Sequence, residues 1–398
     1  MNDRLQSIDM LRGLAILAVL AIHGPHDAPG GFRENIWFLP SFLAGYGYLG
    51  VHLFVLISGF CIHRRAAVGV ANTGEYRLDW GKFWKRRIWR LYPPYVVAIV
   101  ISLVAATVHQ RFVVNHEQIG WDLLLHLTML HNLTEFGTSL GNGSLWSLGM
   151  EEQLYAGYVL LILLFRRSST MMLLCIIGIV TIGWRLSMPV AGPLNLGPFQ
   201  LGKWYLWPLM FWLHWTLGAI AVEVAEGIRT VPRWCSSISL ACIALLIAML
   251  LNRQFVELFI ATKGTISNGV LIAGWWQPWI FTTSELFALL GFYIGLNWLI
   301  EKEGSCWTTH RVARYLAYLG RVSYSVYLVH IPIIYTLEMY VTLQPIGWQW
   351  LVRLILFVGT SIIGGLAFFH VIEKRFVQGK SPIKWSHPRL RTKVISHA

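Results

Sequence analysis

The chain has 398 residues, of which 56% are hydrophobic, 14% aromatic and only 13% charged. Because about a quarter of the residues in a soluble domain are charged, this composition excludes an ordinary soluble protein and predicts a polytopic membrane protein. The net charge of +13 would favour nucleic acid as a partner of a soluble chain. Here the positive-inside rule explains it better, and no nucleic acid is expected. The five cysteines form no C-x-x-C pair, so we expect neither a disulfide framework nor a metal site.

Apolar runs predict an all-α fold with about ten transmembrane helices, at residues 8–27, 46–63, 91–109, 144–165, 170–187, 206–224, 236–252, 279–300, 316–336 and 350–372. With a cytoplasmic N-terminus, 25 of the 32 Lys and Arg residues fall in or beside cytoplasmic segments, so both termini are expected there. We expect one membrane-embedded domain over residues 1–373. A short basic cytoplasmic tail over residues 374–398 is expected to be disordered or to lie on anionic lipid.

The first predicted span carries Asp9 and Arg12 near one end and His23 near the other. Eleven residues separate Arg12 from His23, which at about 100° per residue returns both to within roughly 20° of one helix face. The two side chains then lie about 16 Å apart along the axis. A charged residue inside a membrane helix is costly and indicates function, although an arginine that reaches back to the membrane surface and an interfacial histidine would give the same pattern.

The second span contains Ser58 and Gly59, which interrupt an apolar run and indicate either a helix-packing seam or a catalytic serine. The loop that follows ends in a cationic, aromatic-rich segment with Arg86, Arg87 and Arg90. Arg86 and Arg90 are four residues apart and so share a helix face. Such a segment binds either anionic lipid or the phosphates of a cofactor, since the arginine fork matches phosphate oxygens.

Two adjacent glutamates, Glu151 and Glu152, stand about two turns into the fourth span. Glu151 is expected roughly 10 Å below the outer surface, at a depth comparable with that of His23. A buried carboxylate beside an imidazole orients it and stabilises its charged form. The alternative is a hydrogen bond to a neighbouring helix that serves stability alone.

The ninth span is polar on one side, because Ser323, Tyr327 and His330 share one helical face. His330 lies toward the outer half and would be a third ionisable group near His23. Either His330 contacts the substrate, or it is a structural histidine held by hydrogen bonds. His26, His52, His63, His126 and His131 are further histidines near predicted helix ends.

Six short motifs in this order resemble the membrane acyltransferase 3 family and cover nearly the whole chain. They are D-x-L-R-G with a histidine eleven residues after the arginine (Asp9, Arg12, Gly13, His23), G-V-x-L-F-x-x-x-S-G-F (Gly50 to Phe60), R-R-x-x-R-x-x-P (Arg86, Arg87, Arg90, Pro93), W-S-L-x-x-E (Trp146 to Glu151), S-Y-x-x-Y-L-x-H-x-P (Ser323, Tyr324, Tyr327, His330, Pro332) and E-K-x-F (Glu373, Lys374, Phe376). The chain departs from the family pattern at His52, where an acidic residue is common, and at Arg375, where proline is common.

The resemblance implies transfer of an acyl group, usually acetyl from cytoplasmic acetyl-CoA, to a hydroxyl of a cell-envelope or exported glycan or a related acceptor. It also implies a multi-pass protein of a bacterial-type inner membrane. Many relatives carry a soluble esterase-like domain after the last span, and we expect a form without that domain. Arg86, Arg87, Arg90 and Ser58 are then expected to bind the donor.

His23 is expected at the reaction centre, as the base that deprotonates the acceptor or as a transient acyl carrier. Glu151 would orient its imidazole, Arg12 would mark the donor-facing end of the site, and His330, Tyr327 and Asp9 would contact substrate.

Two other functions fit the buried ionisable residues. A transporter or flippase could use Arg12, His23 and Glu151 as a proton or substrate relay, although the inverted repeats typical of transporters are not evident. A non-catalytic scaffold in envelope assembly would have no need of His23 or of the arginine cluster. Donor binding separates the enzyme from both, because neither alternative requires CoA.

Overall fold

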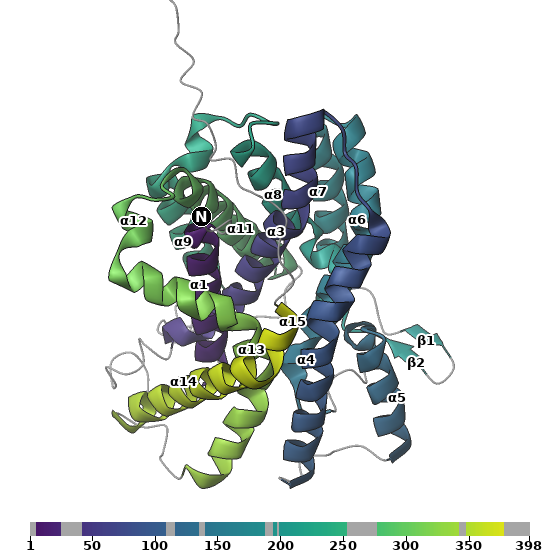
Figure 1. The fold of residues 1–398 in the computed structure, drawn as a ribbon, viewed down its shortest axis with the longest axis vertical. Helices are drawn as coiled ribbons and strands as arrows, with labels where there is room; N and C mark the ends of the chain where they lie inside the picture. Colours follow the sequence, from purple (N-terminus) through teal and green to yellow (C-terminus); the bar gives the residue numbers. More distant parts are fainter. Residues whose placement is uncertain are drawn as a thin grey trace, which may run out of the picture.

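The computed structural model describes residues 5–24, 42–108, 116–134, 140–187, 194–196, 199–252, 277–341 and 348–377. These residues are almost entirely helical (Figure 1). The exception within them is a small antiparallel sheet of β1 (Leu194–Leu196) and β2 (Phe199–Leu201), in which Leu194 pairs with Leu201. The all-α prediction is therefore confirmed for the helical framework, with this hairpin as the addition.

Each of the ten predicted spans overlaps a long helix. The helices are α1 (Gln6–Ile22), α3 (Leu49–Thr73), α4 (Trp80–Val108), α6 (Trp146–Arg167), α7 (Thr170–Ser187), α8 (Pro208–Ala225), α9 (Ile238–Leu251), α11 (Gln277–Glu301), α13 (Arg311–Tyr340) and α14 (Trp348–Phe368). Shorter elements are η1 (Gly45–Tyr48), α5 (His116–Leu127), η2 (His131–Leu133), η3 (Gly143–Leu145), η5 (Trp204–Leu206), η6 (Arg233–Ser236), α12 (Cys306–Thr309), the π-helix η8 (Phe369–Glu373) and α15 (Lys374–Val377).

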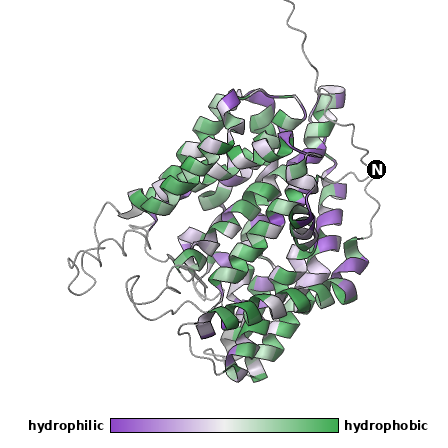
Figure 2. Ribbon diagram, turned by 90° about the vertical axis from the view of Figure 1, so that its left-hand side faces the viewer, coloured by the Kyte–Doolittle hydropathy of each residue, from purple (hydrophilic) through white to green (hydrophobic). Residues whose placement is uncertain are grey.

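Seven of the described helical segments are long and apolar enough to cross a membrane, which makes this a multi-pass membrane protein. The set excludes α1 and α9, which have 17 and 14 residues, and α13, which has 30 residues but many polar ones. The count of ten spans and the cytoplasmic position of both termini stay predictions. In Figure 2 most ribbons are hydrophobic over much of their length, and hydrophilic stretches gather toward the side where the N-terminus lies.

Several basic segments meet at one end of the bundle, which we call the basic end. They are the start of α1, the stretch between α3 and α4, the end of α6 and the stretch after α11. Both carboxylate oxygens of Glu303, just after α11, accept hydrogen bonds from the first backbone N–H groups of α1, at Gln6 and Ser7. Arg166 at the end of α6 bonds the carbonyl of Tyr76 between α3 and α4. The segments that the charge pattern assigns to one membrane face therefore lie together.

The helices α3 and α4 extend farther toward the basic end than predicted. The second span was expected to end at residue 63, but α3 continues to Thr73 and closes on Gly74, whose φ of 74° is the left-handed cap that glycine adopts readily. The third span was expected from residue 91, but α4 begins at Trp80. In α3 no proline separates the basic stretch from the apolar run, and in α4 the helix continues through Pro93 and Pro94.

Two glycine crossings bring pairs of helices into close contact. At the first, Gly320 of α13 lies on the backbone of Asp9, and Gly13 of α1 lies on the backbone of Leu316; a Cβ at either glycine would collide with a carbonyl. At the second, Gly59 of α3 lies on the backbone of Trp215 in α8. Small residues permit such close packing in membranes, where packing drives helix association. The packing seam expected at Ser58 and Gly59 is therefore present.

The helix α4 contains Pro93 and Pro94, which remove two backbone donors inside it. Beside them, the Tyr324 hydroxyl donates to the carbonyl of Leu91 at 2.8 Å and ties α13 to α4. At the other end of the chain the helical path continues from α14 through η8 into α15, where the Phe376 ring contacts Trp89 of α4. The start of the predicted tail thus packs on the bundle, and residues 378–398 lie outside the described part.

Candidate active site

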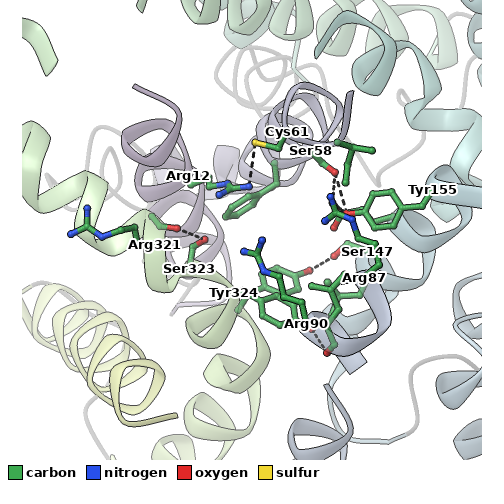
Figure 3. A pocket seen from close by; sticks show the side chains of 17 residues that line it. Arg12, Ser58, Cys61, Arg87, Arg90, Ser147, Tyr155, Arg321, Ser323 and Tyr324 are labelled. Carbon is green, nitrogen blue, oxygen red and sulfur yellow. Dashed lines mark hydrogen bonds between the residues drawn. The ribbon is translucent and has the colours of Figure 1, made fainter. Parts of the chain in front are cut away.

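A cavity opens between α1, α3, α4, α6 and α13 and encloses about 850 Å³, including the part open to solvent (Figure 3). It brings together residues from five of the six sequence motifs. Its walls are formed by Arg12, Phe54, Ser58, Cys61, Ile62, Arg87, Arg90, Leu91, Ser147, Leu148, Glu151, Tyr155, Gly320, Arg321, Ser323, Tyr324 and Tyr327. Four arginines and one glutamate are among them, so the cavity suits an anionic ligand.

Glu151 is the carboxylate of the cavity wall. Its Oε1 accepts hydrogen bonds from the hydroxyls of Ser58 on α3 and of Tyr155, one turn farther along α6. The indole of Trp215 donates to Ser58 Oγ at 3.4 Å. These bonds join α3, α6 and α8 at one point and hold the Ser58 hydroxyl at the cavity surface.

Arg12 faces this cavity from α1. Its Nη1 lies 3.7 Å from Asp9 Oδ1, and its Nη2 donates to Cys61 Sγ at 3.4 Å. The Asp9 side chain is 5% exposed and that of Arg12 is 22% exposed. Asp9 therefore positions Arg12 from behind, and Asp9 itself is absent from the cavity wall.

Arg87 and Arg90 line the cavity from α4, and in Figure 3 Arg90 points toward its centre. The Arg87 guanidinium lies over the Tyr155 ring at 5.1 Å, a geometry in which a cation is attracted to the aromatic face. Arg86 is not among the lining residues, and its charged neighbours are Arg65, Arg87 and Asp79. The face of α4 that meets the cavity passes through Arg87, Arg90 and Leu91, and a contact of Arg86 with the donor stays a prediction.

A second group of polar rings lies beyond the cavity, on the side away from the basic end. Tyr327 lines the cavity, exchanges a hydrogen bond with Ser147 at 2.6 Å and donates to the carbonyl of Ser144 at 2.6 Å. Its ring centroid is 5.4 Å from that of His330, which in turn is 5.1 Å from that of His23. His23 caps the C-terminal end of α1 and is half-buried, whereas His330 is fully buried.

The sequence places His23 and Glu151 at one depth as a pair, and the described contacts do not support that pairing. Glu151 takes its hydrogen bonds from Ser58 and Tyr155 and shares the cavity wall with Arg12. His23, about 16 Å farther along α1, packs on His330. The helices α1 and α13 advance together from the Gly13–Gly320 crossing to the two histidines, so the site has two levels joined by Tyr327.

The other histidines named from the sequence have partners of their own, apart from His26, which lies outside the described residues. His52 Nδ1 is 2.9 Å from His214 Nε2, and its Nε2 is 3.9 Å from Glu285, so this departure from the family pattern belongs to a separate buried network. His63 binds Glu223 and Tyr158, and His126 stacks on His131 at 3.9 Å. Within the described chain no group of three or more His, Cys, Asp or Glu residues could hold a metal ion.

Three cavity residues with polar or thiol side chains were not predicted from the sequence: Cys61, Tyr155 and Arg321. Cys61 and Tyr155 each follow a predicted residue by about one helical turn, after Ser58 and Glu151, so helical spacing could have identified both. Arg321 lies at the cavity edge, and Figure 3 shows its side chain pointing away from the other arginines.

With this geometry established, similarity to known proteins identifies the family. A family profile described as an acyltransferase domain matches residues 5–370, nearly the whole chain. The chain belongs to the acyltransferase 3 family. The resemblance drawn from the six motifs is therefore confirmed.

Two curated relatives share this similarity. The peptidoglycan O-acetyltransferase OatA of Listeria monocytogenes is 24% identical over 381 residues, which cover 91% of this chain and 54% of OatA. YrhL of Bacillus subtilis, named as a candidate peptidoglycan O-acetyltransferase, is 28% identical over 158 residues, covering 37% of this chain and 22% of YrhL. The chain thus spans about half the length of OatA and less of YrhL. No solved structure matches it.

Proposed function

We propose that this protein is a membrane O-acyltransferase that moves an acetyl group from cytoplasmic acetyl-CoA to a hydroxyl of a cell-envelope glycan. One observation carries the proposal: arginines from α1 and α4 meet the Ser58–Glu151–Tyr155 cluster in a single cavity between the helices. The family assignment supports acyl transfer, and the names of the two relatives support peptidoglycan as the acceptor class. The proposal also places the protein in a bacterial inner membrane, where lipid surrounds the helix bundle.

The donor end of the site is the arginine side of the cavity. CoA carries phosphates on its nucleotide and ends in a long, thin thioester arm. Arg87 and Arg90 stand where the cavity meets the basic half of α4, and arginine binds phosphate oxygens with two parallel hydrogen bonds. The arm then extends past Arg12, Ser58 and Glu151 toward Tyr327.

The acceptor end is the histidine pair. His23 lies at the end of α1, half-buried, where an acceptor from the side opposite the basic end can reach it. An imidazole has a pKa near neutrality and is the usual side chain for taking a proton from a hydroxyl. An imidazole of this pair therefore serves as base or as transient acyl carrier, and the sequence favours His23, with His330 and Tyr327 beside it.

Glu151 has a supporting part in this scheme. Its Oε1 fixes the hydroxyls of Ser58 and Tyr155, and its negative charge faces the cavity that Arg12 also lines. A fixed pair of hydroxyls orients the thioester arm, and such positioning contributes strongly to rate. Glu151 acts on the donor, in place of the predicted action on His23.

The test is acetyl-CoA binding to the purified protein in lipid nanodiscs, with two adjacent arginines compared. Arg87→Gln removes a cavity cation, and Arg86→Gln removes a cation from the same helix that does not line the cavity. A charge-assisted hydrogen bond contributes about 1.5–3 kcal/mol, so Arg87→Gln is expected to raise the Kd about 10- to 100-fold. Arg86→Gln is expected to leave the Kd close to that of the wild type.

The reaction itself is measured by transfer of labelled acetyl to soluble peptidoglycan fragments. A wild-type protein that is folded but does not bind acetyl-CoA would contradict the proposal and favour a transporter. Equal weakening by Arg86→Gln and Arg87→Gln would place the phosphates on the surface of the basic end and not in the cavity.

A further inference from the structure

His330 is the most completely buried ionisable group near the acceptor end, with no exposed surface. Its Nδ1 lies 2.6 Å from the carbonyl oxygen of Tyr327, one turn earlier in α13. Its Nε2 is buried and has no hydrogen-bond partner among the described residues. Buried polar atoms are nearly always satisfied, so an unpaired nitrogen at this position needs a reason.

The bond to Tyr327 determines which nitrogen carries the proton. A carbonyl oxygen only accepts, so Nδ1 must be the donor, and in a neutral imidazole the lone pair is then on Nε2. This is the arrangement in which the hydrogen bond at one ring nitrogen prepares the other for chemistry. His330 thus presents a basic nitrogen whose tautomer the helix backbone sets.

The surroundings of the ring link it to both parts of the site. The ionisable rings packed against it are His23 from α1, at 5.1 Å between centroids, and Tyr327 from α13, at 5.4 Å. Tyr327 is part of the cavity wall on the donor side, and His23 is the half-buried residue on the acceptor side. The end of the cavity at Tyr327 is therefore one aromatic ring away from His330.

We propose that His330, through Nε2, is the general base of the acyl transfer and that His23 holds the acceptor hydroxyl. Nε2 takes the proton of the hydroxyl while the hydroxyl oxygen bonds to the thioester carbonyl carbon. The carbon–sulfur bond breaks, the CoA thiolate leaves, and the proton on His330 then passes to that thiolate. This inference rests on the proposed function, and it assigns the base role to the second imidazole of the pair.

The test compares His330→Gln with His23→Gln in nanodiscs, using acetyl-CoA and two acceptors. The first acceptor is a soluble peptidoglycan fragment, whose hydroxyl needs a base. The second is hydroxylamine, which is unprotonated near neutral pH and attacks a thioester without one. General base catalysis contributes about 10²- to 10⁴-fold, so His330→Gln is expected to lower kcat/KM for the glycan at least about 100-fold. Its rate with hydroxylamine stays near that of the wild type.

The pH profile gives a second measurement. The wild-type rate of glycan transfer is expected to fall at acid pH as the base becomes protonated, and His330→Gln lacks this acid limb, whereas His23→Gln keeps it and raises KM. Imidazole added to His330→Ala is expected to restore part of the rate. His131→Gln is the matched control, because His131 is also buried, bonds one carbonyl through Nε2 and has an unpaired Nδ1, but stacks on His126 away from the cavity.

Three other results would contradict the proposed roles of the two histidines. If His23→Gln loses the acid limb and His330→Gln keeps it, His23 is the base. If His330→Gln loses both reactions equally and unfolds at a lower temperature than the His131→Gln control, its role is structural. If the wild type transfers acetyl to neither acceptor, the proposed function itself fails, and this inference fails with it.

Discussion

Two buried clusters on α3, five residues apart, each hold a glutamate that accepts hydrogen bonds from a tyrosine and from a residue of α3, but their surroundings differ. In the first, the His63 imidazole bonds Glu223 of α8 at 2.8 Å, and Tyr76 and Arg229 bond the same carboxylate. The side chains of His63 and Glu223 have no exposed surface, and neither lines the cavity. This cluster is closed, and it locks the loop after α3 onto α8.

The second cluster joins Ser58 of α3 to Glu151 of α6, with Tyr155 on the same oxygen. Unlike the first, it forms part of a cavity wall that Arg12 also lines. A buried carboxylate in a membrane helix is costly and needs polar partners in both cases. Hydrogen-bond partners alone therefore do not distinguish a structural cluster from a functional site. An adjoining cavity does.

The largest expected effect is the loss of stability when the closed cluster is broken. Glu223→Gln keeps the volume of the side chain but removes the charge that Arg229 pairs with inside the bundle. Removing one partner of a buried ion pair costs about 3–5 kcal/mol, so the midpoint of thermal unfolding in nanodiscs is expected to fall clearly. Acetyl transfer per folded molecule stays near the wild-type rate. A large loss of transfer without a change in unfolding would show that the two clusters do not differ as described.

The second effect is a loss of activity without a loss of stability, at the Ser58–Glu151–Tyr155 cluster, which we call the open cluster. Glu151→Gln keeps a hydrogen-bonding side chain next to Ser58 and Tyr155 but removes its charge from the cavity wall. A displacement of about 1 Å at a reacting group can cost 10²-fold in rate, so we expect transfer to fall about 100-fold. Unfolding is expected near the wild-type temperature. A variant that transfers acetyl at the wild-type rate but unfolds at a lower temperature would give this cluster a structural role like that of the first.

The membrane fold follows from the sequence because ten apolar runs are a local signal, and each overlaps a long helix. The cavity was partly predictable for the same reason: Arg12, Ser58, Glu151 and Tyr327 are polar residues in apolar surroundings, where burial needs an explanation. Gly59 could be placed at a close helix contact but not matched with its partner Trp215, because the two residues are distant in sequence.

What the sequence could not supply is the rotation and depth of one helix against another. The choice between Arg86 and Arg87 depends on how α4 turns toward the cavity, since helical spacing allows Arg90 to share a face with either. The pairing of Glu151 with His23 stays a prediction that the described contacts do not support. Counting residues from the outer surface placed both near one level, but Glu151 lies at the level of Arg12 and His23 lies with His330.

A third, smaller effect tests whether the open cluster depends on how closely α1 and α13 pack. A Cβ at Gly320 would meet the carbonyl of Asp9, so Gly320→Ala must separate the two helices. Overpacking of this kind costs about 1–3 kcal/mol, and it moves Asp9 and with it Arg12. We expect lower stability together with weaker acetyl-CoA binding. Gly295→Ala in α11 is the control, because its Cβ has open space, and equal losses in both variants would remove the crossing from the explanation.

The smallest expected effect concerns the contact between Arg12 and Cys61, which lies in the same cavity wall as the second cluster. Arg12 Nη2 donates to Cys61 Sγ at 3.4 Å, while Asp9 holds its other nitrogen. Cys61→Ala removes this acceptor, whereas Cys61→Ser supplies an oxygen that can replace it. A hydrogen bond contributes about 0.5–1.5 kcal/mol net, so the alanine variant is expected to bind acetyl-CoA a few-fold more weakly, and the serine variant close to normally. If the alanine variant binds as tightly as the wild type, Asp9 alone positions Arg12. If the serine variant binds as weakly as the alanine variant, the size and polarisability of the sulfur matter to the donor more than its bond to Arg12.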